Sequence, residues 1–166
     1  NIRDLFEPFI SAERLRCENV TITPDNINEV LGAEGDVDLL SIDTDYHDYW
    51  LWKALDAIRP RVVVVEYNAT LKPPLSLTVP YEADESWDGT SFFGASLTAL
   101  EKLGNEKGYA LVGCCFSGVN AFFVRKDLVG DHFCAPYTAE NHYEPPRYGM
   151  RYPVGHPPRL GLYENV

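Results

Sequence analysis

Four residues whose side chains carry oxygen atoms directly follow two strongly apolar stretches of this sequence. Asp43 and Asp45 follow the first stretch, and Glu66 and Asn68 follow a run of four valines. In open α/β sheets, ligands bind outside the carboxyl ends of the strands. Carboxylate and amide oxygens are ligands that suit Mg²⁺ or Ca²⁺. We therefore expect this end of the sheet to bind a divalent cation through some of these side chains.

The two aspartates have a second interpretation, because a helix is expected to begin at Tyr46. An aspartate at a helix N-cap accepts a backbone N–H and complements the helix dipole. The sequence leaves both roles open for Asp43 and Asp45, and different carboxylates can fill them.

His47 is the histidine closest to these acids in the sequence. Its ordinary pKa lies near neutrality, so it suits a general base that accepts a proton from a substrate hydroxyl. In the first turn of a helix, a histidine is also commonly a solvated surface residue. Asp45, two residues earlier, is the acid we pair with it as a candidate catalytic residue.

The spacing of apolar residues predicts alternating strands and helices. The continuous valine run predicts a central parallel strand covered by helices on both faces. The last two strands are joined by only four residues, which permits only an antiparallel hairpin. The predicted order is a strand at 20–23, a helix at 27–31, a strand at 37–42, a helix at 46–58, a strand at 62–65, a helix at 91–107, and strands at 109–116 and 121–125.

Two long segments have no periodic pattern. The loop 69–90 is longer than compact domains usually contain, so we expect a lid, with Tyr81, Trp87 and Asp88 either lining an acceptor pocket or packing on the surface. The segment 129–166 is rich in proline and tyrosine, which predicts an extended arm that wraps its own domain or a neighbouring chain.

Composition limits the classes of partner. The chain has 166 residues and a formal net charge of −11, which disfavours nucleic acid and anionic membrane surfaces. No apolar run is long enough to span a membrane. Four cysteines without a Cys-x-x-Cys pair predict reduced thiols. We expect one soluble domain, cytoplasmic or, since Asn1 suggests processing or truncation, organellar.

A resemblance to a known family is carried by five stretches of the sequence: 38–50, 60–69, 87–97, 108–109 and 118–125. Over residues 15–128 the chain resembles the C-terminal part of FkbM-type class I S-adenosylmethionine-dependent methyltransferases. The resemblance implies a partial doubly wound, Rossmann-like sheet, mostly parallel with a C-terminal antiparallel hairpin. It divides the chain into an α/β domain, 1–128, and the arm, 129–166.

The resemblance also implies a chemistry, the transfer of a methyl group to a small-molecule or sugar hydroxyl. Asp43 and Thr23 would then contact S-adenosylmethionine, and His47 would be the base. The set Asp43, Glu66 and Asn68 is similar to the metal ligands of catechol-type O-methyltransferases, with Glu in place of Asp.

One part of the family pattern is missing. Class I methyltransferases hold their cofactor at a glycine-rich turn after the first strand, whereas residues 1–19 contain no glycine. The strand at 37–42 would then have an unpaired edge, which the 20–23 strand or another chain must cover. Two hypotheses follow: a methyltransferase whose cofactor site is completed elsewhere, or an inactive methyltransferase-like subunit of a larger assembly.

Overall fold

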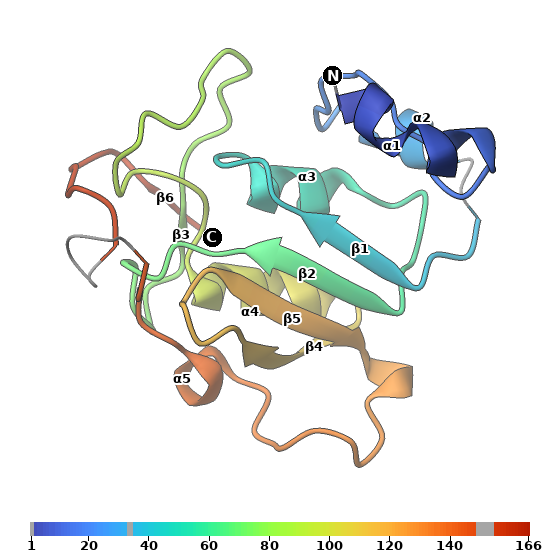
Figure 1. The fold of residues 1–166 in the computed structure, drawn as a ribbon. Coiled ribbons are helices and arrows are strands. Elements are labelled where there is room, and N and C mark those ends of the chain that lie inside the picture. The colour runs from blue at the N-terminus through green and yellow to red at the C-terminus, as the bar shows by residue number, and fades with distance from the viewer. Residues whose placement is uncertain (1, 33–34, 149–154) are drawn as a thin grey trace.

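The fold is a mixed four-stranded sheet with helices, seen in a computed structural model that describes residues 2–32, 35–148 and 155–166 (Figure 1). In spatial order the strands are β1 (Leu39–Ile42), β2 (Val62–Glu66), β5 (Asn120–Arg125) and β4 (Tyr109–Cys114). β1 and β2 are parallel, and β5 runs antiparallel to both β2 and β4. The predicted α/β class and the C-terminal hairpin are therefore confirmed.

The helices are shorter than the apolar spacing predicts. The short helix at 27–31 is confirmed, and an additional helix lies at the N-terminal end. The expected start at Tyr46 is wrong because Tyr46 and His47 are not helical, and the helix begins at Asp48 with His47 as its N-cap. Asp45, just before them, has a left-handed φ of 63°. The next long helix begins after Ser96, whose side chain accepts the N–H of Ala99. The helices are α1 (Ile2–Ser11), α2 (Ile27–Leu31), α3 (Asp48–Ala54) and α4 (Leu97–Glu106).

The core lies between one face of the sheet and the pair α3 and α4. Val63 and Val65 are fully buried there, and the rings of Trp52 and Phe123 pack 4.8 Å apart. The opposite face of β2 is only half-buried. Near Val62 it is covered by the chain around 128–137. The expectation of helices on both faces of the valine strand is therefore wrong, because an irregular segment lies on the second face near Val62.

Residues 20–23 do not form the predicted strand. The N–H of Thr23 donates to Oδ1 of Asn26 at 2.8 Å, and the side-chain amide of Asn26 donates to the carbonyl of Thr21. These bonds form the turn that leads into α2, so the backbone is not free for a sheet. Among the described residues β1 pairs only with β2, and Leu39 on it is 58% exposed.

The C-terminal arm wraps its own domain, one of the two options that the sequence left open. Within the long loop β3 (Leu77–Thr78) pairs with β6 (Glu164–Asn165) near the end of the chain. The Tyr67 hydroxyl donates to the carbonyl of Glu144, and the Tyr143 hydroxyl donates to that of Ala69. The arm and the segment that leads into it also contain η1 (Lys126–Leu128) and α5 (Ala139–His142). Figure 1 shows the arm passing along the end of the sheet where β1 and β2 finish.

Among the helices in the described part of the chain, none has both the length and the apolar character that crossing a membrane requires.

Candidate functional site

Three carboxylates meet at the carboxyl ends of the two parallel strands. Ile42 lies opposite Val65 in the β1–β2 register, so the next residues, Asp43 and Glu66, are also neighbours. Asp45 joins them because its left-handed backbone turns the chain back; aspartate is among the residues that tolerate this conformation best. Carboxylate oxygens of Asp43, Asp45 and Glu66 all lie within 4.8 Å of one another, which is close enough for one metal ion. We call these three residues the acid cluster.

Asp48 is a fourth carboxylate next to the acid cluster. Its side chain is almost fully buried at the start of α3, and Oδ1 accepts the N–H of Thr44 at 2.9 Å. Oδ2 is buried without a hydrogen-bond partner among the described residues. Burial raises the pKa of Asp48 to about 6, and the charge of Asp43 adds to the effect. A buried oxygen without a partner is costly, so it indicates a missing proton or cation.

The carboxylates of the acid cluster repel one another. Burial and, after it, the charges of Asp48, Asp43 and Asp45 together raise the pKa of Glu66 to about 8. Like charges at this distance disfavour full ionisation, so the cluster retains a proton near neutral pH. A divalent cation would remove the same repulsion, and a set of oxygen donors matches what Mg²⁺ and Ca²⁺ prefer.

Asn68 has a structural role in this arrangement. Its side-chain amide donates to the carbonyls of Ser91 and Phe93, and its Oδ1 accepts from the backbone and hydroxyl of Thr70. All its side-chain hydrogen-bonding positions are used, and the residue is fully buried. We therefore assign the cation ligands to the carboxylates alone. The hydrogen bonds of Asn68 instead hold the neighbouring loop in place.

The proposed capping role of Asp43 and Asp45 is wrong. The N-cap of α3 is His47, which makes no side-chain capping bond, and Asp48 accepts the Thr44 N–H instead. Because the helix starts two residues later than predicted, both aspartates stand outside it and are exposed.

His47 and Thr23 lie together in a hollow of about 340 Å³ beside the acid cluster. Three separate segments form it, one before α2, one at the start of α3 and one in the long loop. Tyr81 belongs to it, whereas Trp87 and Asp88 pack near the arm through His156 and Arg159. The lining residues are Val20, Thr21, Ile22, Thr23, Pro24, Thr44, His47, Leu51, Tyr81, Ala83 and Glu85.

The arm places one tyrosine near the acid cluster. The hydroxyl of Tyr148 is buried without a partner among the described residues. Burial raises the pKa of this tyrosine to about 12, with the charge of Glu66 as the next cause. Sequence reasoning missed this residue, since the arm has no periodic pattern that assigns a direction to any side chain.

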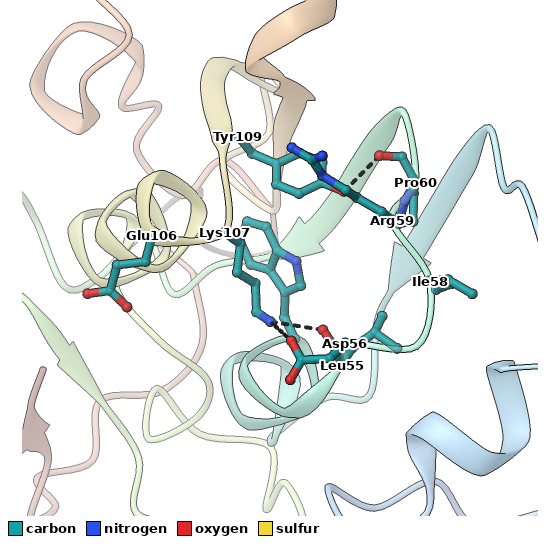
Figure 2. Close-up of a pocket in the computed structure, with 9 residues that line it drawn as sticks. Leu55, Asp56, Ile58, Arg59, Pro60, Glu106, Lys107 and Tyr109 are labelled. Carbon is teal, nitrogen blue, oxygen red and sulfur yellow. Dashed lines mark hydrogen bonds and ion pairs between the residues drawn. The ribbon is translucent and has the colours of Figure 1, made fainter.

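A second hollow, of about 260 Å³, lies at the opposite end of the sheet (Figure 2). There Lys107 donates to the carbonyl of Leu55 and to Asp56, and the Tyr109 hydroxyl donates to the carbonyl of Pro60. These bonds tie the chain before β2 to the chain before β4. Because these bonds join two segments of the chain, we interpret this hollow as a structural joint.

Comparisons with known proteins add no family to this description. No protein-family model matches the chain, and searches of curated proteins and of solved structures gave no match either. A function for the site is therefore proposed from its geometry and from the resemblance in the sequence.

Proposed function

We propose that this chain is a methyltransferase-like α/β domain that binds Mg²⁺ or Ca²⁺ at its acid cluster. The ion would hold a small-molecule or sugar hydroxyl that accepts a methyl group. The observation that carries the proposal is the convergence of Asp43, Asp45 and Glu66 within 4.8 Å at the ends of two parallel strands.

The electrostatics of the cluster support ion binding. Four carboxylates share a small volume, and one of them, Asp48, keeps a buried oxygen without a partner among the described residues. An ion coordinated by several carboxylate oxygens would remove this repulsion, and the remaining coordination positions would be filled by water or by an oxygen of the acceptor. Asp43 and Glu66 are the ligands best placed by the strand register.

The methyltransferase part of the proposal is supported by the layout of the strands. The spatial order β1-β2-β5-β4, with β5 reversed against both neighbours, agrees with the antiparallel final strand expected from the family resemblance. The acids stand at the strand ends where open α/β sheets bind their ligands.

S-adenosylmethionine would supply the methyl group, but the described residues do not form a complete site for it. Among the described residues no strand precedes β1, and residues 2–19 contain no glycine, so the glycine-rich turn of the family has no counterpart in this part of the chain. Thr23 remains the proposed contact, and the other contacts would have to come from another segment or chain.

A calorimetric titration with S-adenosylmethionine, with and without Mg²⁺, tests the proposal. Saturable binding that requires Mg²⁺ and is lost in Asp43→Ala is the expected result. Asp131→Ala, an exposed acid in the arm, is the control that should bind as the wild type does. No binding of either the ion or S-adenosylmethionine by folded protein would contradict the proposal.

A second candidate function is that of a non-catalytic interaction subunit. It is favoured by the edge of β1, where Leu39 is exposed, and by the exposed apolar residues Leu5 (73%) and Phe9 (46%) on α1. Unpaired apolar edges promote pairing with other chains. If this role holds, light scattering will show concentration-dependent association that Leu39→Lys abolishes, whereas a monomer at every concentration would argue against self-association through this edge.

A further inference from the structure

The helix α1 presents an apolar face to solvent. Residues 3–9 are all exposed, and they include the large apolar side chains of Leu5, Phe6 and Phe9. These three residues are spaced at i, i+1 and i+4, so they lie on one face of the helix. Among the described residues, the hydrophobic clusters of the core contain none from α1. Figure 1 shows the helix at the periphery of the molecule, on the side of β1.

An apolar groove lies beside this helix. Its volume is about 490 Å³, and it is bordered by the chain at 14–22 and by α2. Leu15 and Val20, which line it, are exposed, so the groove is open to another molecule. Its apolar lining residues are Leu15, Val20, Ile22, Val30 and Leu31.

The helix face and the groove adjoin, but they do not meet within one chain. Arg14 lines the groove, and its guanidinium carbon lies 5.6 Å from the centre of the Phe9 ring. The turn between helix and groove is tight, because the N–H groups of Arg14 and Leu15 both donate to the carbonyl of Phe9. Since only two residues separate Ser11 from Arg14, α1 cannot fold back into the groove without breaking this turn.

A second copy of the chain can fill both surfaces at once. Because the helix face and the groove adjoin, a two-fold axis can place the helix of each molecule in the groove of the other, so that each contact forms twice. Residues 2–22 carry three basic and four acidic side chains, nearly in balance, within a chain of formal net charge −11. Two copies therefore meet here with little of the repulsion that the rest of the surface would cause.

Glu7 and Arg14 give this contact a complementary pair of charges. Glu7 follows Phe6 in α1, and in its own chain its carboxylate accepts a hydrogen bond from the hydroxyl of Ser11. Arg14 lies over Phe9 at the rim of the groove and makes no ion pair among the described residues. In the reciprocal contact, Glu7 of each helix would approach Arg14 of the other molecule. Complementary charges of this kind determine which surfaces pair.

We propose that this chain forms a two-fold symmetric dimer in which α1 of each molecule docks into the groove of the other. The inference goes beyond the ion-dependent function and does not rest on it. It assigns self-association to α1 and the groove, in place of the edge of β1.

Sedimentation equilibrium of a matched pair of variants tests the helix face. Leu5→Ser should weaken dimerisation at least about tenfold, because the change acts at both copies of the contact. Leu160→Ser makes the same change at a wholly exposed leucine in the arm and should associate as the wild type does. Because both leucines are exposed, neither change should disturb the fold.

Mixing two charge-reversed variants tests whether the contact joins two molecules. Glu7→Arg brings two cations together in its own dimer, and Arg14→Glu brings two carboxylates together, so each variant alone should associate more weakly than the wild type. In an equal mixture each helix meets a groove of opposite charge, and association should return to the wild-type level. A contact within one chain cannot be restored by mixing.

A wild-type chain that stays monomeric at every concentration, unchanged association of Leu5→Ser, or no restoration in the mixture would each overturn the inference. Association that Leu39→Lys abolishes and Leu5→Ser leaves intact would overturn it by assigning the contact to the edge of β1. A monomer that co-sediments with phosphatidylcholine vesicles would overturn it by making α1 a lipid anchor. The two proposals fail separately: a dimer that binds no Mg²⁺ contradicts only the ion-dependent function, and a monomer that binds Mg²⁺ contradicts only the dimer.

Discussion

Replacing Glu66 with glutamine should stabilise the ion-free protein at neutral and alkaline pH. In the folded chain the Glu66 carboxyl holds its proton up to a pKa of about 8, mainly because of burial and then of Asp48, while 4.5 is its ordinary value. Folding therefore takes up a proton between these pH values. The contribution of Glu66 to the free energy of unfolding is most favourable below about pH 4.5, and it falls by up to about 1.4 kcal/mol per pH unit as the pH rises toward 8.

The size of the effect follows from this window. Between pH 4.5 and 8 the loss in free energy of unfolding that Glu66 causes can reach roughly 5 kcal/mol. Because Asp48 shares the repulsion, we expect Glu66→Gln to recover about half of this loss near pH 8. In a domain of this size that corresponds to a melting temperature higher by roughly 5–10 °C. Near pH 4.5 the variant and the wild type should unfold together.

Urea unfolding at a series of pH values, in a chelating buffer, measures the difference directly. Glu106→Gln makes the same chemical change at an exposed position at the other end of the sheet and should show no such pH dependence. Saturating Mg²⁺ or Ca²⁺ should reverse the order, because the ion stabilises only the chain that keeps its ligand. A stability difference between Glu66→Gln and the wild type that stays constant with pH would refute the reasoning.

Three further substitutions test the scaffold around the site. Gly118 has a φ of 72°, and a Cβ there would collide with the carbonyl of Pro145. Gly118→Ala should therefore lower the free energy of unfolding by about 1–3 kcal/mol and expose the arm to protease. The control is Gly89→Ala, at a similar φ of 84° with open space around it, which should keep the arm protected. Asn68→Ala should lower the free energy of unfolding, measured with heat or urea, by about 2–5 kcal/mol because two carbonyls lose their donor. A loss below about 1 kcal/mol, roughly that of one ordinary hydrogen bond, would show that Asn68 does not hold the loop in place. Tyr148→Phe removes a buried hydroxyl without a partner among the described residues, so without metal it should raise stability by about 1 kcal/mol, and a loss of stability would reveal a missing hydrogen bond.

The sequence predicted the strands that position the site because their apolar runs are unambiguous. The valine run and the run before Asp43 predicted two neighbouring parallel strands, and parallel neighbours place Asp43 and Glu66 side by side. The hairpin followed from the length of its linker alone. In these cases local pattern and tertiary arrangement agree.

The features that the sequence did not predict depend on tertiary contacts, which leave no local pattern in the sequence. The helix after β1 was expected two residues too early, since apolar spacing does not show that Asp45 adopts a left-handed conformation. Because the helix begins at Asp48, that acid is buried, and Asp45 lies outside the helix in the acid cluster. Thr23 meets His47 only because the turn at Asn26 replaces the expected strand.

The arm was the least predictable part. Its prolines predicted extended chain, but they did not say where the chain lies. Its position depends on particular contacts, such as the hydroxyl of Tyr67 that donates to the carbonyl of Glu144 and the absence of a side chain at Gly118. Tyr148 reaches the neighbourhood of Glu66 through these contacts.

Paramagnetic line broadening by Mn²⁺ tests the central claim most directly, because Mn²⁺ binds oxygen ligands much as Mg²⁺ does and erases the NMR signals of nearby amides. At a small fraction of one Mn²⁺ per chain, the amides of Asp43, Thr44, Asp45 and Glu66 should disappear first, and an excess of Mg²⁺ should restore them. Asp43→Asn should abolish this selective loss. Broadening spread evenly over exposed acids such as Glu82 and Glu85, or no selective loss at all, would contradict a divalent cation site at the ends of β1 and β2.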